Sequence, residues 1–141
     1  MTNDTTTAAF IDTNVWLYAF IIGQDPVKRQ QAVELIRTTE TIFISTQVIN
    51  EVCTNLLRKE NKSEQELRDV IDDFYELYTV LEIDRAQLLH ASFLREKYAL
   101  SYWDGVIIAS AVRSTAPIVY SEDMHDGLVV EQRVRIVNPF R

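Results

Sequence analysis

The chain has little cysteine and glycine, and it has no long apolar run. A single cysteine, Cys53, excludes an internal disulfide and a cysteine-clustered zinc site. Because its neighbours are apolar, we expect a buried and unreactive thiol. The three glycines exclude the Gly-rich phosphate loops of P-loop and dinucleotide-binding proteins. No apolar run approaches the roughly 18 residues of a membrane span, and the polar N-terminus lacks a signal-peptide layout. We therefore expect a cytoplasmic protein without a membrane segment.

Positive charge is also scarce. The chain carries 14 Lys and Arg residues against 21 Asp and Glu residues, which gives a formal net charge of −7. This balance has the wrong sign for a nucleic-acid binder, since contacts to phosphates come from Lys and Arg. Any function on nucleic acid would need a local basic patch or bound cations.

Apolar segments of two kinds alternate along the chain. At 141 residues the chain is expected to form one domain, with residues 1–7 as a flexible polar N-terminus. The alternation of strands and helices predicts an α/β/α sandwich around a central, mostly parallel sheet of about five strands. The expected strands are residues 8–11, 41–45, 79–83, 117–121 and 133–137. The expected helices cover residues 15–22 and 26–39 and begin at four further caps, Thr46, Ser63, Asp84 and Ser101.

Four acids follow expected strands in a similar way. Asp12 ends the first strand, Glu51 lies in the helix after the second, Asp104 lies in the first turn of the helix from Ser101, and Asp123 follows the fourth strand. In a parallel sheet these positions gather at the carboxyl edge, where ligands bind. Clustered carboxylates repel one another unless a cation lies between them, and such oxygen ligands favour Mg²⁺ or Mn²⁺. A divalent ion there could support phosphodiester hydrolysis.

Each acid also has a simpler interpretation. Asp12 could be a helix cap worth about 1 kcal/mol, and Asp104 could compensate a helix dipole. Glu51 could be a solvated charge on a helix, and Asp123 and Asp126 could be turn residues. A phosphoacceptor receiver domain fits poorly, because it would need paired acids after the first strand and a lysine after the fifth. Spacing alone leaves the metal site and the simpler roles open.

Four segments of the chain together resemble the motifs of the PIN-domain ribonucleases. Ile11-Asp12-Thr13-Asn14-Val15 is similar to the opening motif, Asn50-Glu51-Val52 to the second acid, residues 101–111 to the third, and residues 120–124 to the last. Their order and spacing agree over nearly the whole sequence. At this size the chain resembles the stand-alone VapC-type toxins of bacterial toxin–antitoxin pairs.

The resemblance implies a PIN-like fold and a Mg²⁺- or Mn²⁺-dependent endoribonuclease. It implies an RNA substrate (tRNA, rRNA or mRNA), a cognate antitoxin and frequent homodimers. The catalytic and metal-binding acids would be Asp12, Glu51, Asp104 and Asp123, with possible support from Thr13, Asn14, Ser121 and Asp126. The alternative is a non-catalytic PIN-fold module that binds RNA or protein, which the low positive charge favours.

Overall fold

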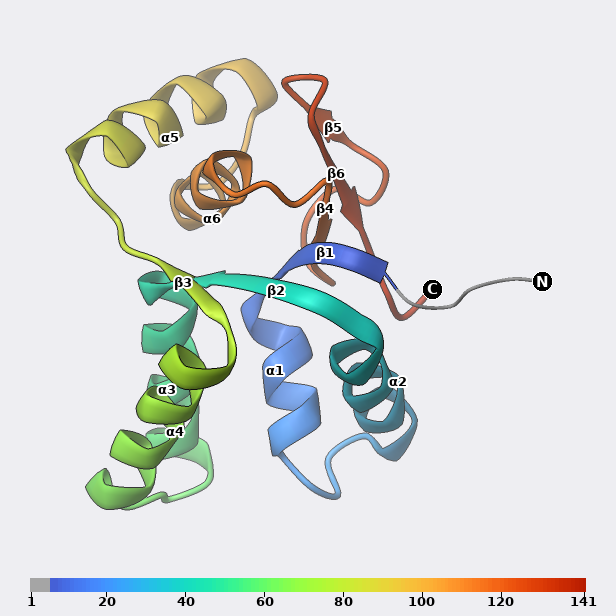
Figure 1. Cartoon of the computed structure of the whole chain (residues 1–141), viewed down its shortest axis with the longest axis vertical. Coiled ribbons are helices and arrows are strands. Elements are labelled where there is room, and N and C mark those ends of the chain that lie inside the picture. Colours follow the sequence, from blue (N-terminus) through green and yellow to red (C-terminus); the bar gives the residue numbers. More distant parts are fainter. Residues whose placement is uncertain (1–5) are drawn as a thin grey trace.

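The computed structural model describes residues 6–141, which form helices on both faces of one sheet (Figure 1). The strands are β1 (Thr6–Ile11), β2 (Thr39–Ser45), β3 (Thr79–Leu81), β4 (Ile118–Tyr120), β5 (Val129–Val130) and β6 (Val134–Val137). Their order is β3-β2-β1-β4-β6-β5, and every pair of neighbours is parallel except β5 and β6. The predicted α/β class with a mostly parallel central sheet is confirmed.

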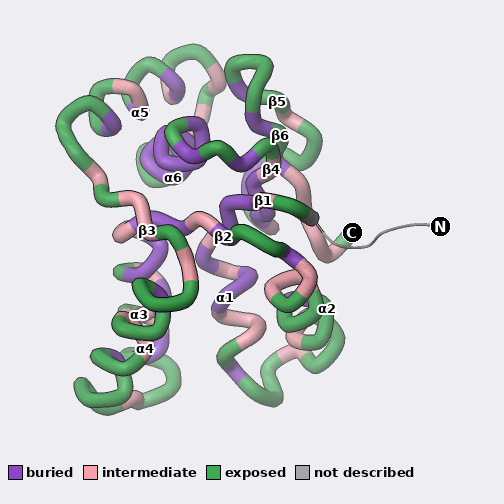
Figure 2. The backbone as a smooth tube through the Cα atoms, in the orientation of Figure 1, coloured by how far each residue is buried: buried purple, intermediate pink, exposed green. Residues whose placement is uncertain are grey.

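The helices form two layers. In Figure 1, α1 (Thr13–Phe20), α2 (Pro26–Thr38), α3 (Thr46–Lys59) and α4 (Glu64–Leu77) lie below the sheet, whereas α5 (Arg85–Tyr98) and α6 (Tyr102–Arg113) lie above it. The tube in Figure 2 is coloured as buried along most of α6 and along the inner parts of the strands. No helix within residues 6–141 has the length and apolarity needed to cross a membrane.

Most helices begin where local side-chain chemistry predicts. Ser63 and Asp84 each accept a hydrogen bond from the third backbone N–H of their helix, in complete capping boxes. Ser101 caps α6 in the same way, by accepting from the backbone N–H of Asp104 at 3.2 Å. The expected cap Thr46 is wrong, because Ser45 at the end of β2 caps α3 instead. The strand thus leads into the helix without a loop.

Two further expectations need correction. Of the N-terminal segment 1–7, residues 1–5 lie outside the described residues, but Thr6 and Thr7 belong to β1 and are therefore not part of a flexible tail. The expected count of five strands misses β5, which pairs with β6 across Glu131 and Gln132. Both turn residues have positive φ, +53° and +57°. Hairpin turns of this kind usually contain Asn or Gly, so the sequence gives no signal for this one.

Trp16 fixes the start of α1 against the core. Its ring is 1% exposed and packs on Phe74 and Tyr78, with ring centroids 5.1 and 5.0 Å away. Its Nε1 donates a hydrogen bond to the carbonyl of Ile11 at 3.1 Å, directly before Asp12. The turn that carries Asp12 is therefore held rigidly at the carboxyl end of β1.

Cys53 is half-buried at the edge of the core, which is less than the expected full burial, and burial raises the pKa of its thiol.

Candidate active site

Asp12 joins the two central strands of the sheet. Its backbone N–H donates to the carbonyl of Tyr120 at 3.0 Å, so it lies where β1 and β4 end side by side. Its Oδ1 accepts from the backbone N–H of Thr13 at 2.7 Å and caps α1. The other oxygen, Oδ2, accepts from the Ser121 hydroxyl at 2.8 Å. The simpler role as a helix cap is therefore real, and the carboxylate still faces a cavity.

This cavity brings together the four acids that follow the strands. It has a volume of about 130 Å³ and is bounded by residues from α1, α3 and α6 and from the segment after β4. Its lining residues are Asp12, Thr13, Asn14, Glu51, Asn55, Trp103, Asp104, Ile107 and Asp123. The carboxyl edge of the sheet thus collects the acids as the parallel topology predicts.

Two acids of the cavity, Asp12 and Glu51, have raised pKa values. The pKa of Asp12 is raised to about 6, first by burial and then by the nearby Asp104 and Asp123, although hydrogen bonds from Thr13 and Ser121 oppose the rise. The pKa of Glu51 is raised to about 7, again mainly by burial, with added repulsion from Asp12 and Asp104. The cavity therefore concentrates negative charge that water solvates poorly.

The supporting polar residues differ in what they contact. Ser121 is fully buried and bonds Asp12, and the Asn14 side-chain amide donates to Asp123 Oδ2. The Thr13 hydroxyl and Glu51 Oε1 are buried and, among the described residues, neither makes a hydrogen bond of good geometry, although the side chains of Gln47 and Thr13 lie close enough to Glu51 to lower its pKa. Because buried polar atoms are normally paired, these two atoms mark a place where a ligand or a water would be stabilised.

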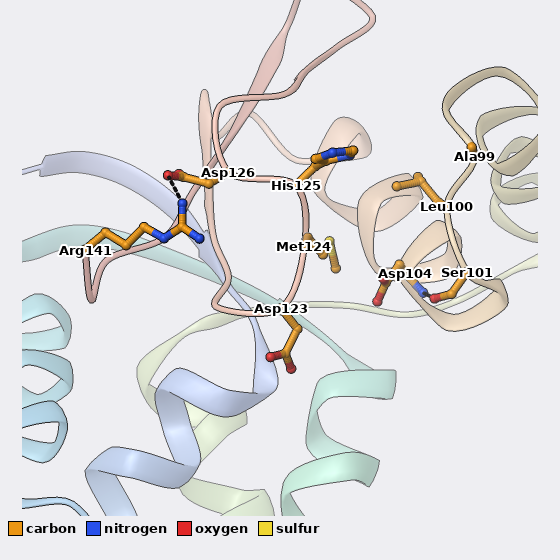
Figure 3. Close-up of a pocket in the computed structure, with 9 residues that line it drawn as sticks. All are labelled: Ala99, Leu100, Ser101, Asp104, Asp123, Met124, His125, Asp126 and Arg141. Carbon is orange, nitrogen blue, oxygen red and sulfur yellow. Dashed lines mark hydrogen bonds and ion pairs between the residues drawn. The ribbon is translucent and has the colours of Figure 1, made fainter.

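Asp126 is directed elsewhere. Figure 3 shows its carboxylate turned toward Arg141 and away from Asp104 and Asp123. Its Oδ1 accepts from the backbone N–H of Asn138 at 2.8 Å, and its Oδ2 lies 3.7 Å from Arg141 Nη1. Asp126 lines a wider adjacent cavity of about 440 Å³, which shares Asp104 and Asp123 with the first. Its contacts give it a structural role in tying the C-terminal segment to the loop after β4.

The ion pair that anchors this loop joins residues far apart in the chain and could not be predicted from their positions. Lys28 pairs with the carboxylate of Glu122, the residue before Asp123. Its ammonium group also lies 5.1 Å from the ring centroid of Tyr18 and 5.6 Å from that of Phe140. The Tyr18 hydroxyl donates to Glu122 at 2.7 Å. Glu122 is thus engaged by α1 and α2, whereas Asp123 is left facing the cavity.

Three cavity residues were also missed by the sequence reasoning. Asn55 lies one helical turn after Glu51 and donates its side-chain amide to the Glu51 carbonyl at 2.8 Å. Trp103 and Ile107 lie on α6 on either side of Asp104. The four-residue spacing from Glu51 to Asn55 could have identified Asn55, since it places both on one helix face. For Trp103 the only signal was its position next to an acid.

The donor set suits a hard divalent cation. It consists of carboxylate oxygens, with one buried glutamate oxygen that is unpaired in the described chain, and Mg²⁺ and Mn²⁺ prefer such ligands. Across residues 6–141, no three acidic, histidine or cysteine side chains are already grouped closely enough to hold one ion together. The carboxylates are near enough to repel one another, and their chemistry fits a cation that would draw them closer.

Fold and cavity together define an α/β domain with an acidic site at the carboxyl edge of its sheet. The PIN domain family model matches residues 9–125, a span that includes all four acids of the cavity. The chain therefore belongs to the PIN domain family. A search of curated protein sequences found no match.

Solved structures with a similar fold include a toxin–antitoxin complex and a toxin. A toxin–antitoxin complex from Klebsiella pneumoniae is 20% identical, covers 93% of this chain and 97% of its own, and gives a TM-score of 0.70. VapC20 from Mycobacterium tuberculosis, a toxin that cleaves the sarcin–ricin loop, is 16% identical over 82% of this chain and 89% of its own, with a TM-score of 0.68. FitAcB from Neisseria gonorrhoeae is 15% identical over 94% and 98%, with a TM-score of 0.61. At these identities the likeness is one of fold.

Proposed function

We propose that the protein is a Mg²⁺- or Mn²⁺-dependent endoribonuclease and the toxin of a toxin–antitoxin pair. The observation that carries the proposal is the convergence of four carboxylates on one cavity, with the pKa of Asp12 at about 6 and that of Glu51 at about 7. Such a cluster is unfavourable for folding alone, and membership of the PIN domain family supplies a reason for it. The fold of known toxins is consistent with the same role.

In this proposal the chain's own residues hold and orient the reacting groups. Asp12, Glu51, Asp104 and Asp123 are the metal-binding and catalytic acids, and a bound ion would supply charge for activating water and stabilising the leaving oxygen. Ser121 orients Asp12, and Asn14 orients Asp123, through the hydrogen bonds that the structure contains.

Metal binding is expected to weaken as the pH falls. A divalent ion binds the ionised carboxylates, so protons compete with it over the range in which Asp12 and Glu51 titrate, about pH 6 to 7. The dissociation constant for Mn²⁺, measured by titration calorimetry, should be at least about tenfold larger at pH 6 than at pH 8. Asp12→Asn should weaken binding at both pH values, whereas Asp126→Asn should leave it unchanged.

The same calorimetry separates the proposal from its main alternative. The alternative is a non-catalytic PIN-fold module that binds RNA or protein. The net charge of −7 favours it over the enzyme, because such a chain binds the phosphates of an RNA substrate poorly without cations. Such a module has no requirement for an ion between its acids. Absence of Mn²⁺ binding at pH 8 would therefore contradict the enzyme and support the module.

The toxin assignment makes a separate prediction about cells. Induced alone in the bacterial cytoplasm, the wild type should arrest growth through cleavage of tRNA, rRNA or mRNA, whereas Asp12→Asn at the same expression level should not. We expect the toxin to form a homodimer. We also expect a neighbouring reading frame to encode a small antitoxin that binds the toxin and restores growth when the two are co-expressed. Unimpaired growth at high wild-type expression would count against a toxin, and it would leave the metal-binding test unaffected.

A further inference from the structure

Two large aromatic side chains are exposed at the start of α6, directly before Asp104. Tyr102 is 55% exposed and Trp103 is 56% exposed. Their rings meet edge to face, with centroids 5.1 Å apart and an interplanar angle of 78°. Aromatic side chains bury large apolar areas when they pack, so leaving two adjacent ones in water sacrifices stabilisation. These two residues are called the aromatic pair below.

The aromatic pair is continuous with the acidic cavity. Trp103 lines that cavity together with Asp12, Glu51, Asp104 and Asp123. An exposed indole therefore forms part of the wall where the phosphodiester is proposed to lie. Among the described residues that line this cavity, Trp103 is the one aromatic side chain, so a base attached to that phosphodiester could stack only on its ring.

Arg95 of α5 holds the aromatic pair in place. Its guanidinium carbon lies 4.2 Å from the ring centroid of Tyr102, and its Nη1 donates to the Tyr102 carbonyl at 3.1 Å. Gly105 makes room for this side chain, because a Cβ at that position would lie 2.5 Å from Arg95 Cγ. Arg95 thus fixes Tyr102 from behind, and its positive charge stabilises the face of that ring. Trp103 is in turn held by its contact with Tyr102.

We propose that Trp103, supported by Tyr102 and Arg95, is a stacking platform for an unpaired nucleobase next to the scissile phosphate. This inference rests on the proposed ribonuclease function and adds to it a residue that positions the substrate. Base–aromatic stacking does not depend on net positive charge and accepts any base. It therefore supplies binding that a chain with a net charge of −7 cannot obtain from phosphate contacts alone. Bases in a continuous duplex are not available to such a platform.

The test uses the intrinsic fluorescence of the full chain in an Asp12→Asn background, which prevents cleavage. The chain has two tryptophans, and Trp16 is 1% exposed, so quenching by a ligand reports on Trp103. The probes are a ten-nucleotide single-stranded RNA, an abasic oligomer with the same backbone and a fully paired duplex of the same sequence, each with Mn²⁺ present. We expect the single strand to quench the fluorescence, and the abasic and duplex probes to quench it little.

Variants then measure the contribution of the ring. Trp103→Ala should weaken binding of the single strand about 5- to 100-fold, as measured by anisotropy of a labelled RNA. Trp103→Phe should recover part of that loss, because a smaller aromatic face remains. Phe93→Ala is the matched control, since Phe93 on α5 is a 68% exposed aromatic outside both cavities. It should leave the affinity unchanged.

Equal affinity of Trp103→Ala and the parent for the single strand would overturn the platform. So would a conversion of dimers to monomers by Trp103→Ala without a change in RNA affinity, because that result assigns the aromatic pair to a contact between copies of the chain. Cleavage by the otherwise wild-type enzyme is measured in parallel. If the wild type cleaves RNA and Trp103→Ala binds and cleaves RNA equally well, only the stacking role of Trp103 is contradicted. If the wild type neither binds nor cleaves RNA, the ribonuclease function fails.

Discussion

In metal-free buffer, the free energy of unfolding is expected to be about 2–4 kcal/mol larger at pH 5 than at pH 8. The native pKa of Asp12 is about 6 and that of Glu51 about 7, against unfolded values of 3.8 and 4.5. Between these limits the native state binds more protons than the unfolded state, so stability falls as the pH rises. The lower end of this free-energy range allows for a smaller contribution from Glu51, because its side chain is half-buried and partly screened by water.

Other carboxylates do not reverse this trend in the chosen window. Ion pairs and hydrogen bonds lower the pKa values of Glu34, Glu66 and Asp84, so the stabilisation that these carboxylates provide is lost only at more acidic pH.

Chemical denaturation with EDTA present, at pH 5 and at pH 8, measures the difference in the free energy of unfolding. Asp12→Asn should shrink the difference and raise the stability at pH 8, because one buried charge is removed from the cluster. Saturating Mn²⁺ should likewise stabilise the wild type at pH 8. A wild type that is more stable at pH 8 without metal would contradict the raised pKa values.

The second large effect concerns cleavage. Asp104→Asn is expected to lower the rate of RNA cleavage by about 10³-fold, since loss of one charged ligand removes several kcal/mol of transition-state stabilisation. The fold should survive, because Asn is nearly isosteric and the cap contact of α6 uses the backbone N–H of residue 104. Initial rates on a labelled RNA in excess Mn²⁺, with circular dichroism as a check on folding, provide the measurement.

Asp126→Asn is the matched control for this prediction. Asp126 lies close to the site in sequence, yet its carboxylate is held by Asn138 and Arg141. Its substitution should change the cleavage rate by less than about threefold, the scale of a lost surface contact. A loss as large as that of Asp104→Asn would show that Asp126 belongs to the catalytic set after all.

The parts of the fold that follow from local chemistry were predictable from the sequence. The capping boxes that begin at Ser63 and Asp84 depend on residues three positions apart, and both helices start there. The convergence of the acids followed from one further assumption, that the strands are parallel. Since Asp12, Glu51, Asp104 and Asp123 each come after a strand or early in the next helix, parallel pairing alone brings them to the same edge.

The parts that the sequence could not predict depend on partners far apart in the chain. Glu122 and Asp123 are adjacent acids after the same strand, and only the pairing of Glu122 with Lys28, 94 positions away, distinguishes them. Asp126 resembles a further metal ligand until its contacts with the C-terminal segment are known. The strand β5 was missed for a related reason, because it has two residues and pairs through a turn without glycine.

Cleavage of a mixed RNA pool by the purified wild type and by Asp12→Asn, each with Mn²⁺ and with EDTA, tests the proposed active site directly. We expect endonucleolytic products from the wild type with Mn²⁺ and no products above background in the other three reactions. Equal cleavage by the wild type and by Asp12→Asn, or cleavage by the wild type that persists in EDTA, would contradict the central claim that these carboxylates form a metal-dependent active site.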